Sequence, residues 1–285
     1  MPYFLEFLLY LSILWILLYL CCKYLLSNTK KFYIIRLSFV LGAIFSVVFA
    51  IVSFPLIPAD IQYLVQDNFE IPIVSTTSNT IIQVNESNDL DIYLQFITWQ
   101  SVIFVLWLLI VVIEFYKILK SIRSIAKIKK QAYRIESYHK ARIYYVSLPI
   151  APFSFADSIF INPQGIDSNE QSIILIHEYI HVKEKHTIDI LLVKFLNAIL
   201  WFCPFNRKIE QFVHQNLEFI VDQNIISNHR IPLKLYQYLL LKIVQVAPLS
   251  SIKWVHTFAL QPLKNRIMMM NKSSKSKYNN MKIAL

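Results

Sequence analysis

The sequence predicts a mainly α-helical membrane protein, in which three transmembrane helices precede a cytosolic α+β domain. Its composition is the first reason: 56% of the 285 residues are hydrophobic and 16% are charged, whereas soluble domains are about 25% charged. The second reason is that three segments contain the roughly 20 apolar residues that a membrane-spanning helix needs. The third is the distribution of lysine and arginine, which places everything after about residue 117 in the cytosol.

The predicted transmembrane region covers residues 1–116, with spans at about 1–22, 37–59 and 92–116. A backbone in hydrocarbon must satisfy its own hydrogen bonds, so each span is expected to be a helix. The first span has no basic leader and precedes no small-residue cleavage site. We therefore interpret it as a retained anchor rather than a signal peptide.

Charges in the loops predict the orientation of these spans. The loop between the first two spans is basic, whereas the loop at 55–91 contains acidic residues and no lysine or arginine. A strongly basic segment, expected to be a juxtamembrane helix at 117–140, follows the third span. Because excess lysine and arginine mark the cytoplasmic side, the N-terminus and the 55–91 loop should lie outside and the rest inside.

The basic segment accounts for much of the net charge of +10, and no base-stacking aromatic residues are interleaved in it. We therefore expect it to touch anionic head groups of the lipid bilayer, and we expect no nucleic-acid partner. The two glycines, Gly42 and Gly165, cannot form the clustered glycine loops that bind phosphates. The three cysteines form no C-x-x-C motif and no spaced framework, which argues against a cysteine-rich zinc site and a disulfide scaffold.

Residues 141–270 are expected to form the cytosolic domain, and residues 271–285 a disordered tail. Two or three short strands are predicted in the stretch ARIYYVSLPIAPFSFADSIFINPQGIDS, which contains a turn signal at NPQG. The spacing of Ser168 and Gln171 fits a capping box, so a helix should run from about residue 169 to 186.

Three further helices are predicted, at 187–202, 207–227 and 234–246. The first of them is apolar, but its uncharged run is short for a membrane span. Two interpretations of it remain open, a buried core helix and a segment that dips into the membrane.

The stretch LIHEYIHVKEKH, residues 175–186, contains the pattern H-E-x-x-H. His177 and His181 lie four residues apart, so both imidazoles share one helix face and can bind one metal ion at about 2.0–2.1 Å. Glu178 is rotated by about 100° from His177, so it can accept a proton from water without binding the metal. The pattern therefore predicts a Zn²⁺ site, with Glu178 as the catalytic base.

A catalytic zinc needs a third protein ligand, and Glu184 is a poor candidate because it lies a turn beyond His181 on the same helix. Glu218 and Asp222 lie four residues apart in the apolar stretch NLEFIVD, where a buried charge is costly unless it is paired or metal-bound. We assign Glu218 as the third ligand and Asp222 as a group that holds a ligand histidine. His214, one turn before Glu218, is the reserve ligand.

The other polar residues of this half are expected to be structural. Glu210 should be a solvated helix charge. The remaining histidines are expected to lie at the surface or to make local hydrogen bonds, and they are His139, His186, His229 and His256.

Three stretches of the sequence resemble the M56 family of membrane metallopeptidases, the BlaR1/MecR1 antibiotic-sensor type: ILIHEYIHVKEKHTIDILL, WFCPFN and QNLEFIVDQNII. APFSFADSIFINP, YQYLLLK and LKNRIMMMNK are similar to the form common in Bacteroidota. The resemblance implies a zincin domain of the gluzincin type, zinc held by His177, His181 and Glu218, and Glu178 as the catalytic base. It also implies that APFSFADSIF contains an edge strand that aligns a substrate backbone.

The expected function is that of an integral-membrane zinc endopeptidase of the bacterial inner membrane, which cleaves a cytosolic protein in regulatory or signalling proteolysis. A transcriptional repressor is one candidate substrate, and Tyr236 and His214 are candidates for the oxyanion donor. The alternative is a non-enzymatic membrane signalling or scaffold subunit with a structural metal site. No segment corresponds to the extracellular penicillin-binding domain of β-lactam sensors, so β-lactam sensing is not expected. The sequence predicts no particular oligomeric state.

Overall fold

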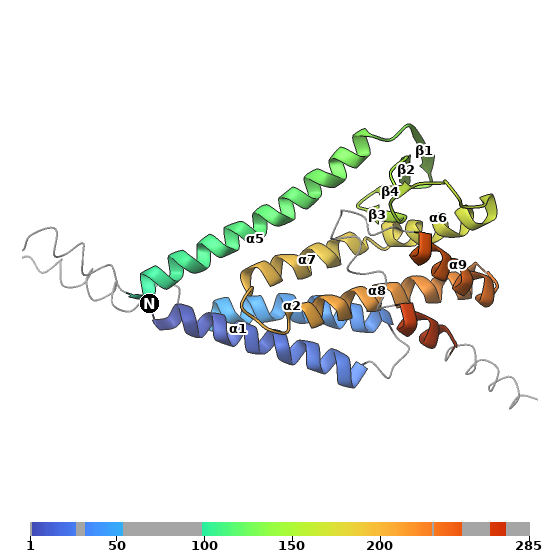
Figure 1. Ribbon diagram of the computed structural model, residues 1–285. Helices are drawn as coiled ribbons and strands as arrows, with labels where there is room; N and C mark the ends of the chain where they lie inside the picture. The colour runs from blue at the N-terminus through green and yellow to red at the C-terminus, as the bar shows by residue number, and fades with distance from the viewer. Residues whose placement is uncertain (1, 27–31, 54–98, 230, 247–262, 272–285) are drawn as a thin grey trace, which may run out of the picture.

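The described part of the protein is mostly helical, as the composition predicted, with one small mixed sheet. Figure 1 shows two long helices, α1 and α2, beside each other, a third long helix, α5, and the sheet at the far end of α5. The predicted external loop and the tail after Asn271 lie outside the described residues. The computed structural model describes residues 2–26, 32–53, 99–229, 231–246 and 263–271.

Three helices are long and apolar enough to cross a membrane: α1 (Pro2–Cys21), α2 (Phe32–Ser53) and α5 (Trp99–Lys130). A short π-helical turn, Cys22–Leu26, extends α1. These helices correspond to the three predicted spans, of which residues 54–59 and 92–98 are not described.

Arg36 lies inside α2 rather than in the preceding loop, because α2 begins earlier than the predicted span. Its Nη2 donates to the carbonyl oxygen of Glu184 at 2.7 Å and lies 2.8 Å from Oδ2 of Asp189. Both partners belong to the helices that follow the sheet. Arg36 therefore connects a membrane-length helix directly to the second half of the chain.

Helix α5 continues through the basic segment without a break and ends at Lys130, whereas the sequence predicted a helix to residue 140. Residues Arg134–Tyr138 instead form strand β1, which pairs antiparallel with strand β2 (Ala141–Tyr145). Pairing between these strands, across the two-residue turn at His139 and Lys140, therefore overrides the helical pattern of the basic residues.

The sheet contains four strands in the order β1-β2-β4-β3, more than the two or three predicted. Strand β4 (Ser158–Ile161) is parallel to β2, and the two form the buried centre, while β3 (Phe153–Phe155) pairs antiparallel with β4 at one edge. The turn from β3 to β4 is tight, with a φ of 53° at Ala156. The N–H of Ala156 donates to Oγ1 of Thr187 at 2.9 Å, which holds this edge hairpin against the following helices.

The four helices predicted after the sheet are present among the described residues, each within a few residues of its predicted bounds. They are α6 (Ser168–Lys183), α7 (His186–Ile199), α8 (Asn206–Asn228) and α9 (Leu233–Val246). The predicted turn before α6 is present, with Gly165 at a φ of 75°. The capping box of α6 is formed by Asp167 and Glu170 rather than by Ser168 and Gln171, so the prediction was displaced by one residue.

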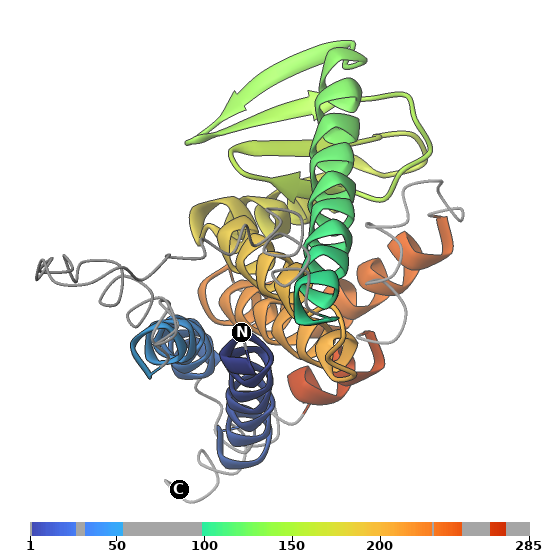
Figure 2. The ribbon, with the colours of Figure 1, turned by 90° about the vertical axis from the view of Figure 1, so that its left-hand side faces the viewer.

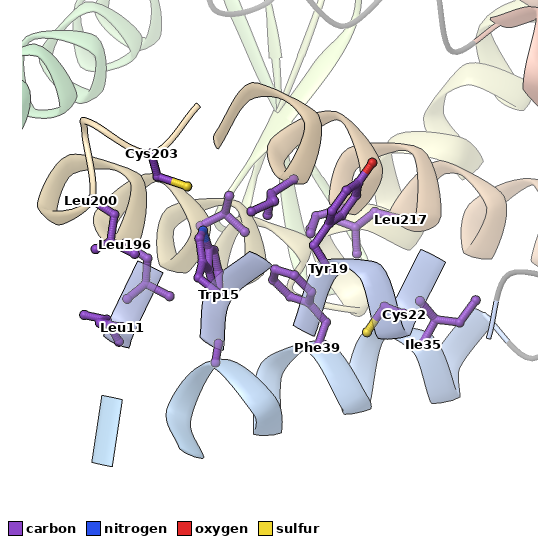
Figure 3. Close-up of a cluster of buried hydrophobic side chains, with 14 of the residues drawn as sticks. Leu11, Trp15, Tyr19, Cys22, Ile35, Phe39, Leu196, Leu200, Cys203 and Leu217 are labelled. Atoms are coloured by element: carbon purple, nitrogen blue, oxygen red, sulfur yellow. The ribbon is translucent and has the colours of Figure 1, made fainter. Parts of the chain in front are cut away.

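Buried side chains form three clusters that connect these elements. One cluster joins α1 and α2 to α7 and α8, as Figure 3 shows. A second lies between the sheet, α6, α8 and α9, and a third between the end of α5 and the sheet. Seen from the end in Figure 2, α7 and α8 lie between the α1–α2 pair and the sheet. The helix that carries the H-E-x-x-H pattern, α6, is thus packed between the sheet and α8.

Candidate metal centre

Helices α6 and α8 bring the three predicted ligands together. His177 and His181 lie one turn apart on α6, and Glu218 faces them from α8. Their ligand atoms all lie within 4.8 Å of one another. Within the described ranges, no other group of three His, Cys, Asp or Glu residues converges in this way.

The distances between these atoms fit a metal ion better than direct hydrogen bonds. Nε2 of His177 lies 3.5 Å from Oε2 of Glu218, and Nε2 of His181 lies 3.6 Å from Oε1. Ligand atoms held by tetrahedral zinc at about 2.0–2.1 Å are roughly 3.3 Å apart, whereas an N–H···O hydrogen bond spans about 2.9 Å. Two imidazoles and a carboxylate at this spacing form a donor set that suits zinc.

The rear nitrogen of His177 is held by a buried tyrosine. Nδ1 of His177 lies 2.9 Å from the hydroxyl of Tyr236, and that hydroxyl donates to Oδ1 of Asp222 at 2.7 Å. Because the hydroxyl gives its single hydrogen to Asp222, it accepts the Nδ1–H of His177. The lone pair of His177 is then on Nε2, the atom that faces Glu218. Asp222 was predicted to hold a ligand histidine, and in the structure it reaches His177 through the hydroxyl of Tyr236.

His181 is supported in a similar way by His186, whose Nδ1 lies 2.9 Å from Nδ1 of His181. His186 is buried, so of its two predicted alternatives, a surface position or a local hydrogen bond, the structure shows the second. Burial is the main cause that lowers the pKa of His186 far below its usual value, with the nearby His181 and Arg36 acting in the same direction. A neutral His186 can accept the Nδ1–H of His181, which directs Nε2 of His181 toward Glu218.

Arg266, in the helical segment 263–271, is a cation of the site that the sequence analysis did not identify. Its Nη1 lies 3.0 Å from Oε2 of Glu218, and its Nε and Nη2 donate to the two oxygens of Asp222 at 2.9 and 2.6 Å. Burial raises the pKa of Glu218, but the lowering causes, of which the charge of Arg266 is the largest, outweigh burial and hold that pKa well below its usual range. Glu218 is therefore ionised, as a metal ligand must be.

The donor atoms line a mostly apolar cavity of about 300 Å³. Glu178 is only 8% exposed and lies on the wall of this cavity beside the two ligand histidines. Strand β3 contributes Phe153 and Phe155 to another wall. Helix α5 contributes four isoleucines, namely Ile118, Ile122, Ile125 and Ile128. The space in front of the donor set is thus enclosed by the edge strand and the third long helix.

The two candidate oxyanion donors occupy different positions. The hydroxyl of Tyr236 is engaged behind His177 by Asp222, so its geometry does not favour a role in front of the metal ligands. His214 lines the cavity but does not belong to the group of converging ligand atoms. Burial, and then the charge of Lys194, lowers the pKa of His214 well below its usual value. A neutral imidazole on the cavity wall can donate a hydrogen bond, and His214 therefore remains a candidate.

Membrane-length helices and a convergent His-His-Glu donor set are features of a membrane metallopeptidase. The family model described as BlaR1 peptidase M56 matches residues 6–270, nearly the whole chain. This chain therefore belongs to the M56 peptidase family, whose members are membrane proteins and generally zinc-dependent metallopeptidases. The resemblance inferred from the sequence is confirmed. No curated protein matches the chain.

Proposed function

We propose that this protein is an integral-membrane zinc endopeptidase whose residues 141–270 form a zincin domain of the gluzincin type. The observation that carries the proposal is the convergence of His177, His181 and Glu218, with Glu178 buried beside them on the wall of one cavity. A purely structural zinc site has four protein ligands and no use for an adjacent carboxylate base. Membership of the M56 peptidase family supports the same interpretation.

The chemistry follows from the positions of these groups. A zinc ion held by His177, His181 and Glu218 supplies Lewis-acid chemistry, which acidifies water and polarises a carbonyl group. Glu178 accepts the proton of the attacking water and delivers it to the leaving amine. His214 is our candidate for the donor that stabilises the developing oxyanion. The apolar walls of the cavity exclude bulk water, which strengthens the electrostatic interactions of all these groups.

Strand β3 is the proposed binding site for the substrate backbone. It lies at the edge of the sheet and pairs only with β4 among the described strands. Phe153 and Phe155 of β3 line the same cavity as Glu178. An extended peptide can add to such an edge through main-chain hydrogen bonds, which would carry its scissile bond past the metal ligands.

The proposed location is the bacterial inner membrane, with the N-terminus outside and the catalytic domain in the cytosol. The basic residues of α5, such as Lys117 and Lys130, support this orientation because they follow the uncharged part of the helix. A cytosolic protein is therefore the proposed substrate, and a transcriptional repressor is one candidate.

Substitution of the proposed base separates the enzyme from the alternative, a signalling or scaffold subunit with a structural metal. Glu178→Gln keeps the shape of the side chain but removes its ability to accept the proton. We expect zinc to remain bound and cleavage to be lost, so that protein termini newly formed in wild-type cells are missing in cells that carry the variant.

The matched control is Glu184→Gln, which makes the same change directly after the end of α6, outside the donor set, and should leave the termini unchanged. Full proteolysis by purified Glu178→Gln would refute the mechanism. Bound zinc in both proteins with identical sets of termini would favour the non-enzymatic subunit.

A further inference from the structure

The connection between α7 and α8 lies beside the uncharged part of α5. The indole N–H of Trp107 donates to the carbonyl oxygen of Ile199 at 3.1 Å, and the rings of Phe115 and Phe195 meet edge to face with centroids 5.1 Å apart. Trp107 precedes Glu114, the first charged residue of α5, by seven residues. At 1.5 Å per residue, the end of α7 lies about 10 Å beyond that charge, well into a hydrocarbon core about 30 Å thick.

Contacts with α1 and α2 place the connection between α7 and α8 at the same depth. Leu200 and Cys203, in the connection, belong to the same buried cluster as Leu11, Trp15 and Phe39 (Figure 3). Leu11 and Trp15 lie in the interior of α1, 12 and 8 residues before Lys23, the first basic residue that follows the helix. The connection therefore reaches the level of the central part of the membrane-length helices.

Several backbone groups of this connection have hydrogen-bond partners within the protein. The carbonyl oxygen of Leu200 accepts hydrogen bonds from Nδ2 of Asn206 at 2.6 Å and from the N–H of Cys203 at 2.8 Å. The carbonyl of Ile199 is bound by Trp107. Irregular backbone occurs at membrane depth only where its polar groups have such partners, since acyl chains supply none.

The outer surface of the connection is apolar. Phe195, Trp201 and Phe202 are 46%, 40% and 37% exposed. The charged groups between α7 and α8 are paired with each other, because Nζ of Lys194 contacts Oε1 of Glu210. Because the nearby charges are paired with each other, this exposed aromatic patch can lie against hydrocarbon, whereas its exposure to water is costly.

Arg207 and Lys208 are the exposed charges at the start of α8. Their aliphatic stems can lie along the apolar surface while the charged ends extend toward the head groups. The ammonium of Lys208 lies 5.3 Å from the ring centroid of Phe205, which also offsets part of its desolvation.

We propose that the α7–α8 hairpin is a re-entrant membrane element, whose tip at residues 200–205 enters the bilayer from the side of the sheet and returns to it. Acyl chains cover Phe195, Trp201 and Phe202. Helix α5, next to the patch, also exposes apolar side chains, and lipid covers both surfaces; among these side chains are Leu106, Leu109 and Val112. This hairpin anchors the metal-binding helices to the membrane in addition to the three long helices.

Spin labels in phospholipid vesicles test the proposal. A nitroxide is attached at Phe202→Cys in a chain whose native cysteines are replaced, and its collision rates with oxygen and with a water-soluble nickel chelate are measured. Matched labels at Leu109→Cys, on the uncharged part of α5, and Ile135→Cys, on exposed strand β1, define the bilayer and solvent limits.

We expect the Phe202 label to collide preferentially with oxygen, as the Leu109 label does. Preferential collision with nickel, as at Ile135, would place the hairpin in solvent and overturn the proposal. Low collision rates with both reagents would show that a protein surface, such as a second copy of the chain, covers the patch, and would overturn it as well.

A second measurement uses the unmodified protein, so that a poorly folding variant does not decide the result. The chain is reconstituted with phospholipids that carry a photoreactive diazirine on the acyl chain, irradiated and digested. We expect lipid adducts on the peptide that contains Trp201 and Phe202. Adducts confined to α1, α2 and α5 would refute a membrane-inserted hairpin.

Discussion

The front and the rear of the metal centre are built in different ways. The front consists of the Nε2 atoms and carboxylates that face the cavity, and it comes from one short pattern on α6 and one residue of α8. The rear consists of groups that hold those ligands from behind, and its residues come from several elements: Asp222, Tyr236, Arg266 and His186. The front supplies the donors, and the rear fixes the tautomer and charge of each donor.

Removal of a front carboxylate should have the largest effect. Glu218→Gln replaces an anionic donor with a neutral amide while the side chain keeps its size. We expect loss of bound zinc that exceeds the roughly 10–100-fold typical of outer residues, because a direct ligand is lost. Zinc per chain after dialysis against a graded chelator measures this. Gln223→Ala, an exposed change on the same helix, should bind zinc normally; equal zinc retention by Glu218→Gln would exclude Glu218 as a ligand.

Disruption of the buried ion pair at the rear, between Asp222 and Arg266, should have the next largest effect. Asp222 is fully buried and carries the charge opposite Arg266, so Asp222→Asn leaves the guanidinium under-compensated. We expect a loss of about 3–5 kcal/mol in folding free energy, as for other broken buried pairs, seen as a lower Tm in detergent. Asp157→Asn makes the same change in the exposed pair with Arg142 and should cost less than about 1 kcal/mol. Equal Tm shifts in the two variants would contradict this account.

Removal of a single hydroxyl at the rear should have the smallest effect of the three changes. Tyr236→Phe keeps the ring in the core but removes the group that links His177 to Asp222. We expect zinc affinity to fall by about tenfold, at the low end for outer residues, with little change in Tm. Competition with a fluorescent chelator measures the affinity. Tyr238→Phe, an exposed change on the same helix, is the matched control; a tenfold loss in both variants would show that Tyr236 has no specific role.

The residues of the front could be predicted because the sequence patterns that identify them are local. Two histidines four residues apart must share a helix face, and Glu218 stood out as a carboxylate in an apolar stretch. The rear could not be predicted from the same reasoning. Arg266 follows Glu218 by 48 positions in the sequence, and its contact depends on how the last described segment folds back onto α8. His186 gave a weak signal, as a histidine five residues after a ligand, and was predicted only to lie at the surface or to make a local hydrogen bond.

The fold, too, was predicted where a long local pattern determines it and was not predicted where contacts between elements determine it. Long periodic or apolar segments such as α5 and α8 were predicted close to their observed positions. The end of the basic helix was not, because residues 134–138 become a strand only through pairing with β2. The choice between a core helix and a membrane-dipping segment for α7 also depends on its neighbours, here Trp107 and the α1–α2 pair.

The uninterrupted course of α5 has a mechanical consequence. Its 32 residues form a rod of about 48 Å that begins in the apolar layer and ends with Ile128 packed into the cluster beside the sheet. The same helix supplies the isoleucines that line the cavity of Glu178. A tilt of α5 in the bilayer would therefore move this wall of the cavity and change the width of the proposed substrate site.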